Sequence, residues 1–266
     1  MRGYPLTVEK EKESVRLGGM ALQNGVLVHG PKAWGCAVRD EEGNLRVASG
    51  LKPSFSSRVR TPVLRGPARL AEAFALLPVV RRALPQARYP FERPAILGSI
   101  VASSVAVRAI RRNDLLSPGA SEMAAAAASL VPALVALRGP DLAAYHGAEH
   151  VSIGTYETGE PAPKEHPRCG SQLIAPMVAS TMLANAAVAT LPRGARRIGR
   201  LVGAVVAVGA SVELSAWSAR NPERTLSRVL SRPGLELQRR YSTAEPSAAQ
   251  LEVANAARDA CLALEA

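Results

Sequence analysis

Three of the chain's four histidines and one of its three cysteines lie in a single segment, YHGAEHVSIGTYETGEPAPKEHPRCG, residues 145–170. His146 and His150 are four positions apart, so on a helix both rings would project from one face and reach the same ion. Glu149 completes an H-x-x-E-H pattern, the spacing of inverted zinc-peptidase motifs. In those motifs the imidazoles hold zinc and the carboxylate takes a proton from water, so the segment predicts metal chemistry.

A second pair of metal-binding side chains follows in HPRCG, residues 166–170. Pro167 restricts the backbone after His166, and Gly170 frees it after Cys169. Imidazole and thiolate are side chains that zinc prefers, and the connection from the first pair is long enough to fold this pair back. A lone histidine is more often a hydrogen-bonded core residue and a lone cysteine a small packing residue, but two such pairs favour a metal site.

The number of protein ligands decides what the metal does. If all four of these side chains bind, a tetrahedral zinc is closed and structural. If only three bind, one position stays open and Glu149 becomes a general base. Arg168 either polarises a substrate oxygen or neutralises Glu157. The candidate ligands of a divalent metal, with zinc favoured, are His146, His150, His166 and Cys169.

The composition restricts the classes of partner. The chain has 266 residues, enough for one large domain or two small ones, and only 4% are aromatic, which favours helices packed through small side chains. The formal net charge is +11, but the arginines of residues 193–240 have a single aromatic residue, Trp217, among them, so stacking of bases has little support. Anionic lipid headgroups explain the charge more economically, and no nucleic-acid partner is expected; an arginine-biased genome is the remaining explanation.

The cysteines and the first residues both indicate a reducing compartment. Cys36, Cys169 and Cys261 are far apart and odd in number, which does not indicate a disulfide framework. Residues 1–17 are charged and contain no apolar run of the length that a secretory signal needs. We expect this segment to be a flexible arm.

Short apolar runs separated by turn signals occupy residues 18–52. The pattern is typical of strands joined by tight turns, so we expect a small antiparallel sheet. Gly18 and Gly19 favour a turn, although a glycine pair also permits a close backbone approach. The apolar runs are residues 25–28, 34–38 and 45–48.

Two further segments have the pattern of helices, one after the expected sheet and one at the end of the sequence. Residues 66–85 predict a helix that Pro78 kinks or ends. The tail, residues 245–265, predicts another helix, because Ser247 and Gln250 have the spacing of a capping box.

Four segments are almost free of charge, and a membrane-spanning helix needs about 20 apolar residues. Only the third segment clearly meets that length; the second and fourth come close, and the first is short. The pattern favours membrane embedding over a soluble bundle of buried, alanine-rich helices. The segments are residues 95–107, 123–137, 173–191 and 201–217.

The charges give a mixed indication of topology. If the segments form two hairpins, residues 1–94, 139–172 and 218–266 share one side, which holds most of the arginines, as a cytoplasmic face should. Seven arginines in residues 108–113 and 193–200 would then face outward, against that tendency. We expect a protein of the cytoplasmic membrane whose metal site lies on the cytoplasmic side.

Glu213 interrupts the fourth apolar segment. A carboxylate there costs several kcal/mol unless it has a partner. It would be a metal ligand, a partner to a metal-binding histidine, or an ion-pair mate of Arg200, unless this helix stays outside the membrane.

Together these patterns predict an α+β fold: a small N-terminal antiparallel β element followed by a mainly helical, alanine-rich, membrane-embedded bundle. The expected division is an arm (1–17), a β-rich element with an amphipathic helix (18–92), a helical region (93–219) that carries the metal-site loop (139–172), and a C-terminal helical tail (220–266).

The chain also resembles a known family, the YqhQ-like bacterial proteins, a domain of unknown function described as predicted metal-dependent enzymes. YHGAEH and HPRCG carry the specific part of the likeness, and GGMALQNGVLVHGPKAWGCAVR, VLRGPARLAEAF, PGLELQ and LEVA are similar to other parts of the family pattern. The resemblance implies a multi-pass membrane protein with the histidine motifs beside the membrane. It selects Tyr145, His146, Glu149, His150, Tyr156, Glu157, His166, Arg168 and Cys169.

Two functions follow as hypotheses. The first is a membrane-associated zinc-dependent hydrolase that acts on a peptide or amide bond near the bilayer, with Glu149 activating water and Arg168 assisting. The second is a membrane scaffold or assembly factor whose loop is held by a closed structural metal site. Both are compatible with an anionic lipid membrane as partner and with a homo-oligomer.

Overall fold

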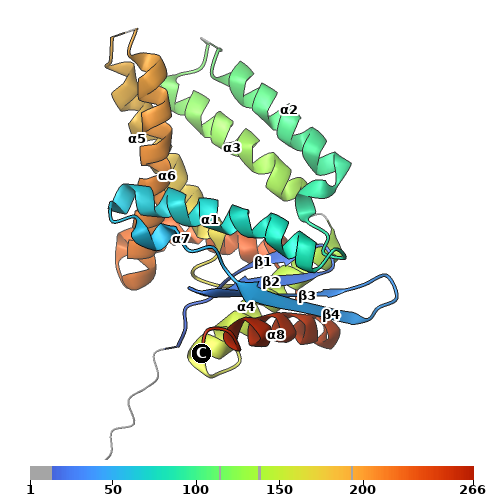
Figure 1. Ribbon diagram of the computed structural model, residues 1–266. Coiled ribbons are helices and arrows are strands. Elements are labelled where there is room, and N and C mark those ends of the chain that lie inside the picture. The colour runs from blue at the N-terminus through green and yellow to red at the C-terminus, as the bar shows by residue number, and fades with distance from the viewer. Residues whose placement is uncertain (1–13, 114, 137–138, 193) are drawn as a thin grey trace, which may run out of the picture.

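The computed structural model describes residues 14–113, 115–136, 139–192 and 194–266. Figure 1 shows two parts: a body in which helices cover a sheet, and two helical hairpins that project from one side of that body. The helix α1, Pro62–Ala83, lies between the sheet and the hairpins. The α+β fold class predicted from the sequence is therefore confirmed.

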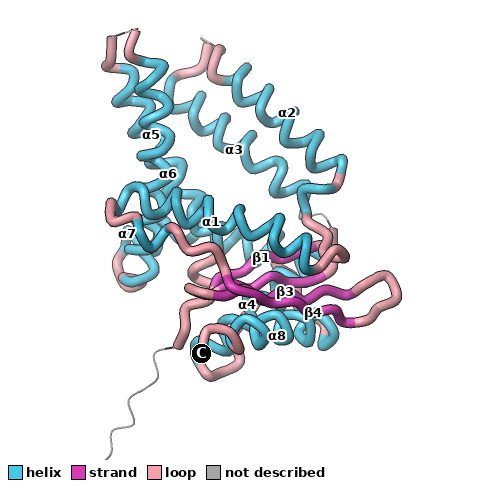
Figure 2. Tube along the Cα trace, in the orientation of Figure 1, coloured by secondary structure: helices cyan, strands magenta, loops and turns pink. Residues whose placement is uncertain are grey.

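The sheet has four antiparallel strands in the order β1-β2-β3-β4, within the expected residues 18–52 (Figure 2). The expectation that Gly18 and Gly19 form a turn is wrong, because both lie in the first strand, opposite His29 and Val28. The reason for the glycine pair is the close approach described below. The strands are β1 Gly18–Leu22, β2 Gly25–His29, β3 Ala33–Arg39 and β4 Leu45–Leu51.

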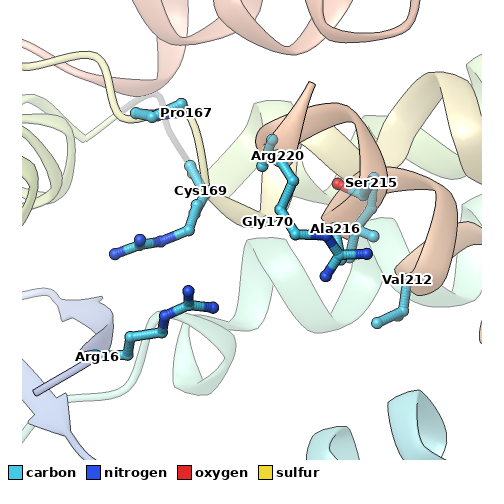
Figure 3. Close-up of a pocket in the computed structure, with 11 residues that line it drawn as sticks. Arg16, Pro167, Cys169, Gly170, Val212, Ser215, Ala216 and Arg220 are labelled. Atoms are coloured by element: carbon cyan, nitrogen blue, oxygen red, sulfur yellow. The ribbon is translucent and has the colours of Figure 1, made fainter. Parts of the chain in front are cut away.

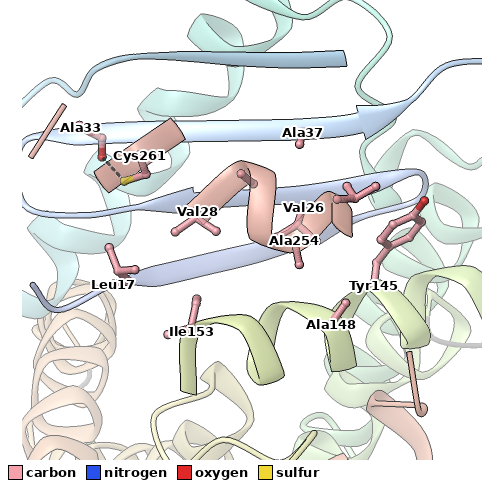
Figure 4. Packing of buried hydrophobic residues seen from close by; sticks show 12 residues of the cluster. Leu17, Val26, Val28, Ala33, Ala37, Tyr145, Ala148, Ile153, Ala254 and Cys261 are labelled. Carbon is pink, nitrogen blue, oxygen red and sulfur yellow. Dashed lines mark hydrogen bonds between the residues drawn. The ribbon is translucent and has the colours of Figure 1, made fainter. Parts of the chain in front are cut away.

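Helices cover the central strands on both faces. Alternate residues of β2 point in opposite directions, so Val26 and Val28 join one apolar cluster and Leu27 joins another. The first cluster lies against α4, Pro140–Thr158, and α8, Ala248–Leu262 (Figure 4). The second lies against α1 and the segment that follows it.

The helix α1 continues through Pro78, so the expectation that the helix ends at this proline is wrong. Leu76 and Val80, on either side of the proline, are fully buried in the second cluster. This packing outweighs the loss of one helical hydrogen bond, and the helix continues to Ala83.

The hairpins consist of α2 with α3 and of α5 with α6 (Figure 1). Three helical segments are long and apolar enough to cross a membrane, residues 119–136, 170–188 and 196–220, whereas α2 is shorter. The bounds of the four helices are α2 Pro94–Ile110, α3 Pro118–Ala136, α5 Ile174–Ala189 and α6 Arg196–Arg220.

The hairpins expose large apolar side chains that the body does not cover. An aqueous protein would bury much of such a surface, so the hairpins are consistent with membrane association. The exposed residues are Leu97, Ile100, Val101, Val105, Met123, Val131, Leu134, Leu183, Ile198, Leu201, Val202, Val205 and Val206.

The remaining elements are short connections and the C-terminal helices. The predicted capping box of α8 is confirmed, with Gln250 donating its backbone N–H to the Ser247 hydroxyl. A π-helix, η4 Gln238–Ser242, joins α7 to the final segment. The other elements are η1 Ser56–Arg58, η2 Pro90–Glu92, η3 Gly170–Leu173 and α7 Thr225–Leu237.

Segments that are distant in the sequence build the body together. The helix α4 packs on β1 and β2 and α8 on β2 and β3, so the segment with the H-x-x-E-H motif packs against the sheet rather than within the hairpins. Of the expected N-terminal arm, residues 1–13 lie outside the described part, while Leu17 is buried in the first cluster.

Candidate metal centre

The helix α4 carries the H-x-x-E-H motif on a firmly packed element. Tyr145, Ala148 and Ile153 are buried in the cluster beneath the sheet. This packing fixes the rotation of the helix, so the face with His146 and His150 is directed toward the loop before η3 and toward η4.

Three donor side chains converge there: His146, His150 and Cys169 each place a ligand atom within 4.8 Å of the others. The two ring centroids are 4.4 Å apart, and Cys169 Sγ lies 3.4 Å from His146 Nε2. Ligands at zinc bond lengths and tetrahedral angles would place a nitrogen and a sulfur about 3.6 Å apart. The spacing and the chemistry of the donors therefore fit a small divalent cation.

Backbone carbonyl groups fix the orientation of both imidazoles. His146 Nδ1 donates to the Ser242 carbonyl at 2.7 Å, and His150 Nδ1 donates to the Lys164 carbonyl at 2.6 Å. Because a carbonyl only accepts, the proton of each neutral ring is on Nδ1 and the lone pair on Nε2 is available for a metal. Burial also lowers the pKa of His150, which keeps that ring neutral.

Gln238 holds the HPRCG loop that carries Cys169. Its side chain accepts from the His166 backbone N–H at 2.7 Å and donates to the His166 carbonyl at 3.2 Å and to the Ser171 hydroxyl at 2.7 Å. Gln238 is fully buried at the start of η4, so the loop is tied to a π-helix. Such single-turn π segments are frequent at functional sites.

Gly147 allows α4 to meet the segment after η4. A Cβ at this position would lie 2.1 Å from the Ala244 carbonyl oxygen, a distance that real atoms do not adopt. The Ala244 N–H also donates to the Ala143 carbonyl at 2.9 Å. This close approach brings the Ser242 carbonyl to His146.

His166, the fourth predicted ligand, does not join the converging group. Its Nε2 lies 3.3 Å from Glu157 Oε2, and its Nδ1 accepts the Arg168 backbone N–H at 3.3 Å. Its ring centroid is 5.6 Å from that of His150. The geometry thus favours Cys169 over His166 as the third donor and leaves one side of the group without a protein ligand among the described residues.

Arg168 and His166 both contact Glu157, and Arg168 forms an ion pair with it. Burial of Glu157 opposes its ionisation, but the hydrogen bond to His166 and the Arg168 charge outweigh burial and lower the pKa of the carboxyl. Of the two roles considered for Arg168, neutralisation of Glu157 is the one present in this structure.

Glu149 is buried between α4 and β1. Its carboxylate lies against Gly19, where an added Cβ would come within 2.6 Å of Oε1. Burial raises the pKa of Glu149, and the nearby His146 and His166 offset this only in part. Within the described residues its Oε2 has no hydrogen-bond partner.

The other predicted site residues lie outside the converging group. Tyr145 is part of the sheet cluster, and Tyr156 packs against it while its hydroxyl accepts the Val15 N–H at 3.1 Å. Glu213 is half-buried in α6. Arg200 is thirteen residues away on the same helix, about 20 Å along its axis, so the suggested ion pair is excluded.

Sequence reasoning missed the groups that orient the donors. Ser242 and Lys164 contribute backbone carbonyls, which no residue pattern can reveal. Gln238 could have been found, since it ends the PGLELQ segment that carries part of the family likeness.

Comparisons with known proteins agree with the resemblance. Residues 141–264 match the family described as "Protein of unknown function (DUF1385)", a range that runs from α4 to the end of α8 and contains the candidate site. The chain is 35% identical over 130 residues to "Uncharacterized protein YqhQ" of Bacillus subtilis (strain 168), covering 46% of this chain and 41% of that relative. The match thus spans less than half the length of the relative. No solved structure matches the chain.

Proposed function

We propose that this YqhQ-like chain is a membrane-associated, zinc-dependent hydrolase. The observation that supports this most is the convergence of His146, His150 and Cys169 within 4.8 Å, with both imidazoles held by backbone carbonyls so that Nε2 is free. Imidazole and thiolate are both ligands of catalytic zinc, which binds three protein side chains and keeps a fourth position open.

The residues around this group support a hydrolytic rather than a purely structural role. A zinc ion, when bound, supplies the acidity that turns water into a nucleophile at neutral pH. Glu149 is the residue to take up a proton, since burial raises its pKa and its Oε2 is unpaired among the described residues. Arg168 holds Glu157 and thereby His166, so it is a positioning residue. The bond cleaved would be a peptide or amide bond near the bilayer.

The metal content of purified full-length variants tests the proposal. Wild-type protein and Glu149→Gln are expected to retain about one zinc per chain, because the carboxylate is not among the three donors. His146→Ala and Cys169→Ser are expected to lose it. The second readout is cleavage of a mixture of peptides presented on membrane vesicles. If Glu149→Gln keeps both its zinc and the full wild-type rate of cleavage, the hydrolytic mechanism is wrong.

A closed structural site in a membrane scaffold is the second candidate. It is favoured by the 5.6 Å separation of the His150 and His166 ring centroids. At this separation, a rotation of the His166 side chain would bring its ring toward the three converging donors. Cobalt substitution separates the two: a tetrahedral spectrum unchanged by added anions supports the scaffold, whereas an anion-sensitive spectrum supports an open site. His166→Ala would perturb only a four-ligand site.

The hairpins support placement in the cytoplasmic membrane with the body and the metal site on the cytoplasmic side. Their exposed apolar residues need a covering that the chain does not provide among its described residues. Between the hairpins, near their tips, lies a cavity of about 1340 Å³ lined by Arg108, Arg111, Arg112 and Arg200 among others. Anionic lipid phosphates of the outer leaflet are suitable partners for these arginines. Their negative charge would offset the cost of placing arginines on the outer side, against the positive-inside tendency.

A further inference from the structure

A cleft of about 330 Å³ opens directly beside Cys169 (Figure 3). Its wall comes from three distant parts of the chain: the segment before β1, the HPRCG loop and the body end of α6. Because Cys169 belongs both to this wall and to the converging donors, a molecule in the cleft lies next to the candidate metal centre.

The cleft is strongly basic. Arg16, Arg168 and Arg220 line it, and the lining contains no aspartate or glutamate. Arg168 is paired with Glu157, but Arg16 and Arg220 have no carboxylate partner within the described residues. Figure 3 shows these two side chains approaching from different elements, so an anion between them could receive hydrogen bonds from both guanidinium groups.

The opposite part of the wall is apolar. Leu173 of η3 and Val212, Ala216 and Ala219 of α6 form it, with Ser215 among them. The same helix, over Arg196–Arg220, is long and apolar enough to cross a membrane, and Arg220 is its last residue. The cleft therefore lies where an apolar span meets a charged body, and its apolar wall continues toward the span.

The geometry points to an anionic amphiphile as the ligand of this cleft: a single aliphatic chain along α6 with a phosphate or carboxylate head between Arg16 and Arg220. This inference rests on the proposed function, since it names the class of substrate that would reach the metal centre from the bilayer surface: an amphiphile whose aliphatic chain and anionic head are joined by the amide bond to be cleaved, for which dodecyl phosphate is a probe of binding alone. A neutral peptide would leave the two guanidinium groups unused, and a small free anion would leave the apolar wall uncovered.

Binding can be measured with native mass spectrometry of the full chain released from neutral detergent. Dodecyl phosphate tests the whole proposal, inorganic phosphate lacks the tail, and dodecyl maltoside lacks the charge. We expect dodecyl phosphate to bind wild type at least about tenfold more tightly than either control, because the maltoside forms no charge-assisted contact with the arginines and inorganic phosphate buries no apolar surface. Equal binding of inorganic phosphate or of the maltoside would overturn the amphiphile assignment.

Matched arginine variants locate the site. The double variant Arg16→Gln/Arg220→Gln should bind dodecyl phosphate about tenfold or more weakly, and Arg16→Lys/Arg220→Lys should recover part of the affinity. Arg224→Gln, an exposed arginine outside the cleft, should bind as wild type does. Undiminished binding by the double glutamine variant would place the ligand elsewhere.

Zinc content measured on the same samples separates this inference from the proposed function. The arginine variants should retain their zinc, because neither residue is a donor. Wild-type protein that holds no zinc but shows arginine-dependent binding would refute the metal proposal and leave the cleft assignment intact. If all variants bind zinc but the binding of the amphiphile does not depend on the arginines, the cleft assignment is refuted and the metal proposal stands.

Discussion

The side-chain amide of Gln238 bonds both backbone polar groups of His166, accepting from the N–H at 2.7 Å and donating to the carbonyl at 3.2 Å. It also bonds the hydroxyl of Ser171, on the other side of Cys169. One buried side chain thus positions a metal-site loop without touching any of the three donor atoms.

Replacing Gln238 by leucine should weaken zinc binding while leaving the donors in place. Outer residues that orient metal ligands typically contribute about 10–100-fold in affinity, and we expect a loss of that size. Competition with a chromogenic chelator would measure it. Arg239→Gln, the exposed neighbour, serves as the control, and an unchanged zinc affinity in Gln238→Leu would show that the loop is held by other contacts.

Gly147→Ala should destabilise the body because its new Cβ would meet the Ala244 carbonyl oxygen at 2.1 Å. Separation of α4 from this segment would also remove the Ser242 carbonyl from His146. We expect a loss of about 2–4 kcal/mol in the free energy of unfolding together with weaker zinc binding.

Gly98→Ala is the matched control for this substitution. Gly98 is also inside a helix, but nothing lies within 4 Å of its added Cβ, so this change should be neutral or slightly stabilising. Chemical unfolding in neutral detergent, followed by tryptophan fluorescence, compares the two variants. Equal stabilities would contradict the close packing at Gly147.

Glu72 should make the stability of the body depend on acid. Burial opposes ionisation of Glu72, but hydrogen bonds from Lys52 and Ser56 outweigh it and lower the pKa to about 2, from 4.5. Because the pKa of Glu72 is lower in the folded state, its ionised carboxylate contributes fully to the free energy of unfolding above pH 4.5. This contribution is lost as the pH falls toward 2. The shift corresponds to about 3 kcal/mol.

Unfolding at several pH values between neutral and acid tests this dependence. Glu72→Gln should be less stable than wild type at neutral pH, and the difference should shrink as the pH approaches 2. A difference that stays constant over this range would mean that ionisation of Glu72 does not contribute.

The proposed topology predicts opposite labelling of two introduced cysteines. Asn113 lies in the connection between α2 and α3 and Glu42 in the turn between β3 and β4, and both are exposed. In intact cells a membrane-impermeant maleimide should label Asn113→Cys, and Glu42→Cys only after lysis. Wild-type protein gives the background after lysis, to which partly exposed Cys169 contributes while Cys36 and Cys261 are buried. The reverse pattern would place the metal site outside the cell.

The sequence was sufficient to predict the local elements that depend on short-range patterns. Short apolar runs between turn signals predicted the sheet, and the capping box at Ser247 predicted the start of the last helix. The glycine pair was misassigned because its cause is not local: Gly19 makes room for Glu149, which is 130 positions away in the sequence.

The candidate site was predictable in its residues but not in its arrangement. The spacing of His146 and His150 indicated a shared face, and the structure brings Cys169 to it. Nothing in HPRCG distinguishes the cysteine from the histidine as the third donor, because that choice depends on Gln238 and Glu157, which hold His166. Likewise, Pro78 was expected to end α1 because tertiary packing against the sheet is invisible in a local pattern.

The sheet receives its last cover from α8, the final helix of the chain. At typical rates of synthesis, the stretch between β3 and α8 takes about 10–40 s to emerge from the ribosome. The apolar face of β3 that packs against α8 therefore stays uncovered by α8 for about that time. Both hairpins leave the ribosome within this interval, so under the proposed topology their insertion into the membrane would precede closure of the body. Gln238 and Ser242 are also synthesised after both hairpins, so a nascent chain completes the histidine–cysteine cluster only after the hairpins have been made.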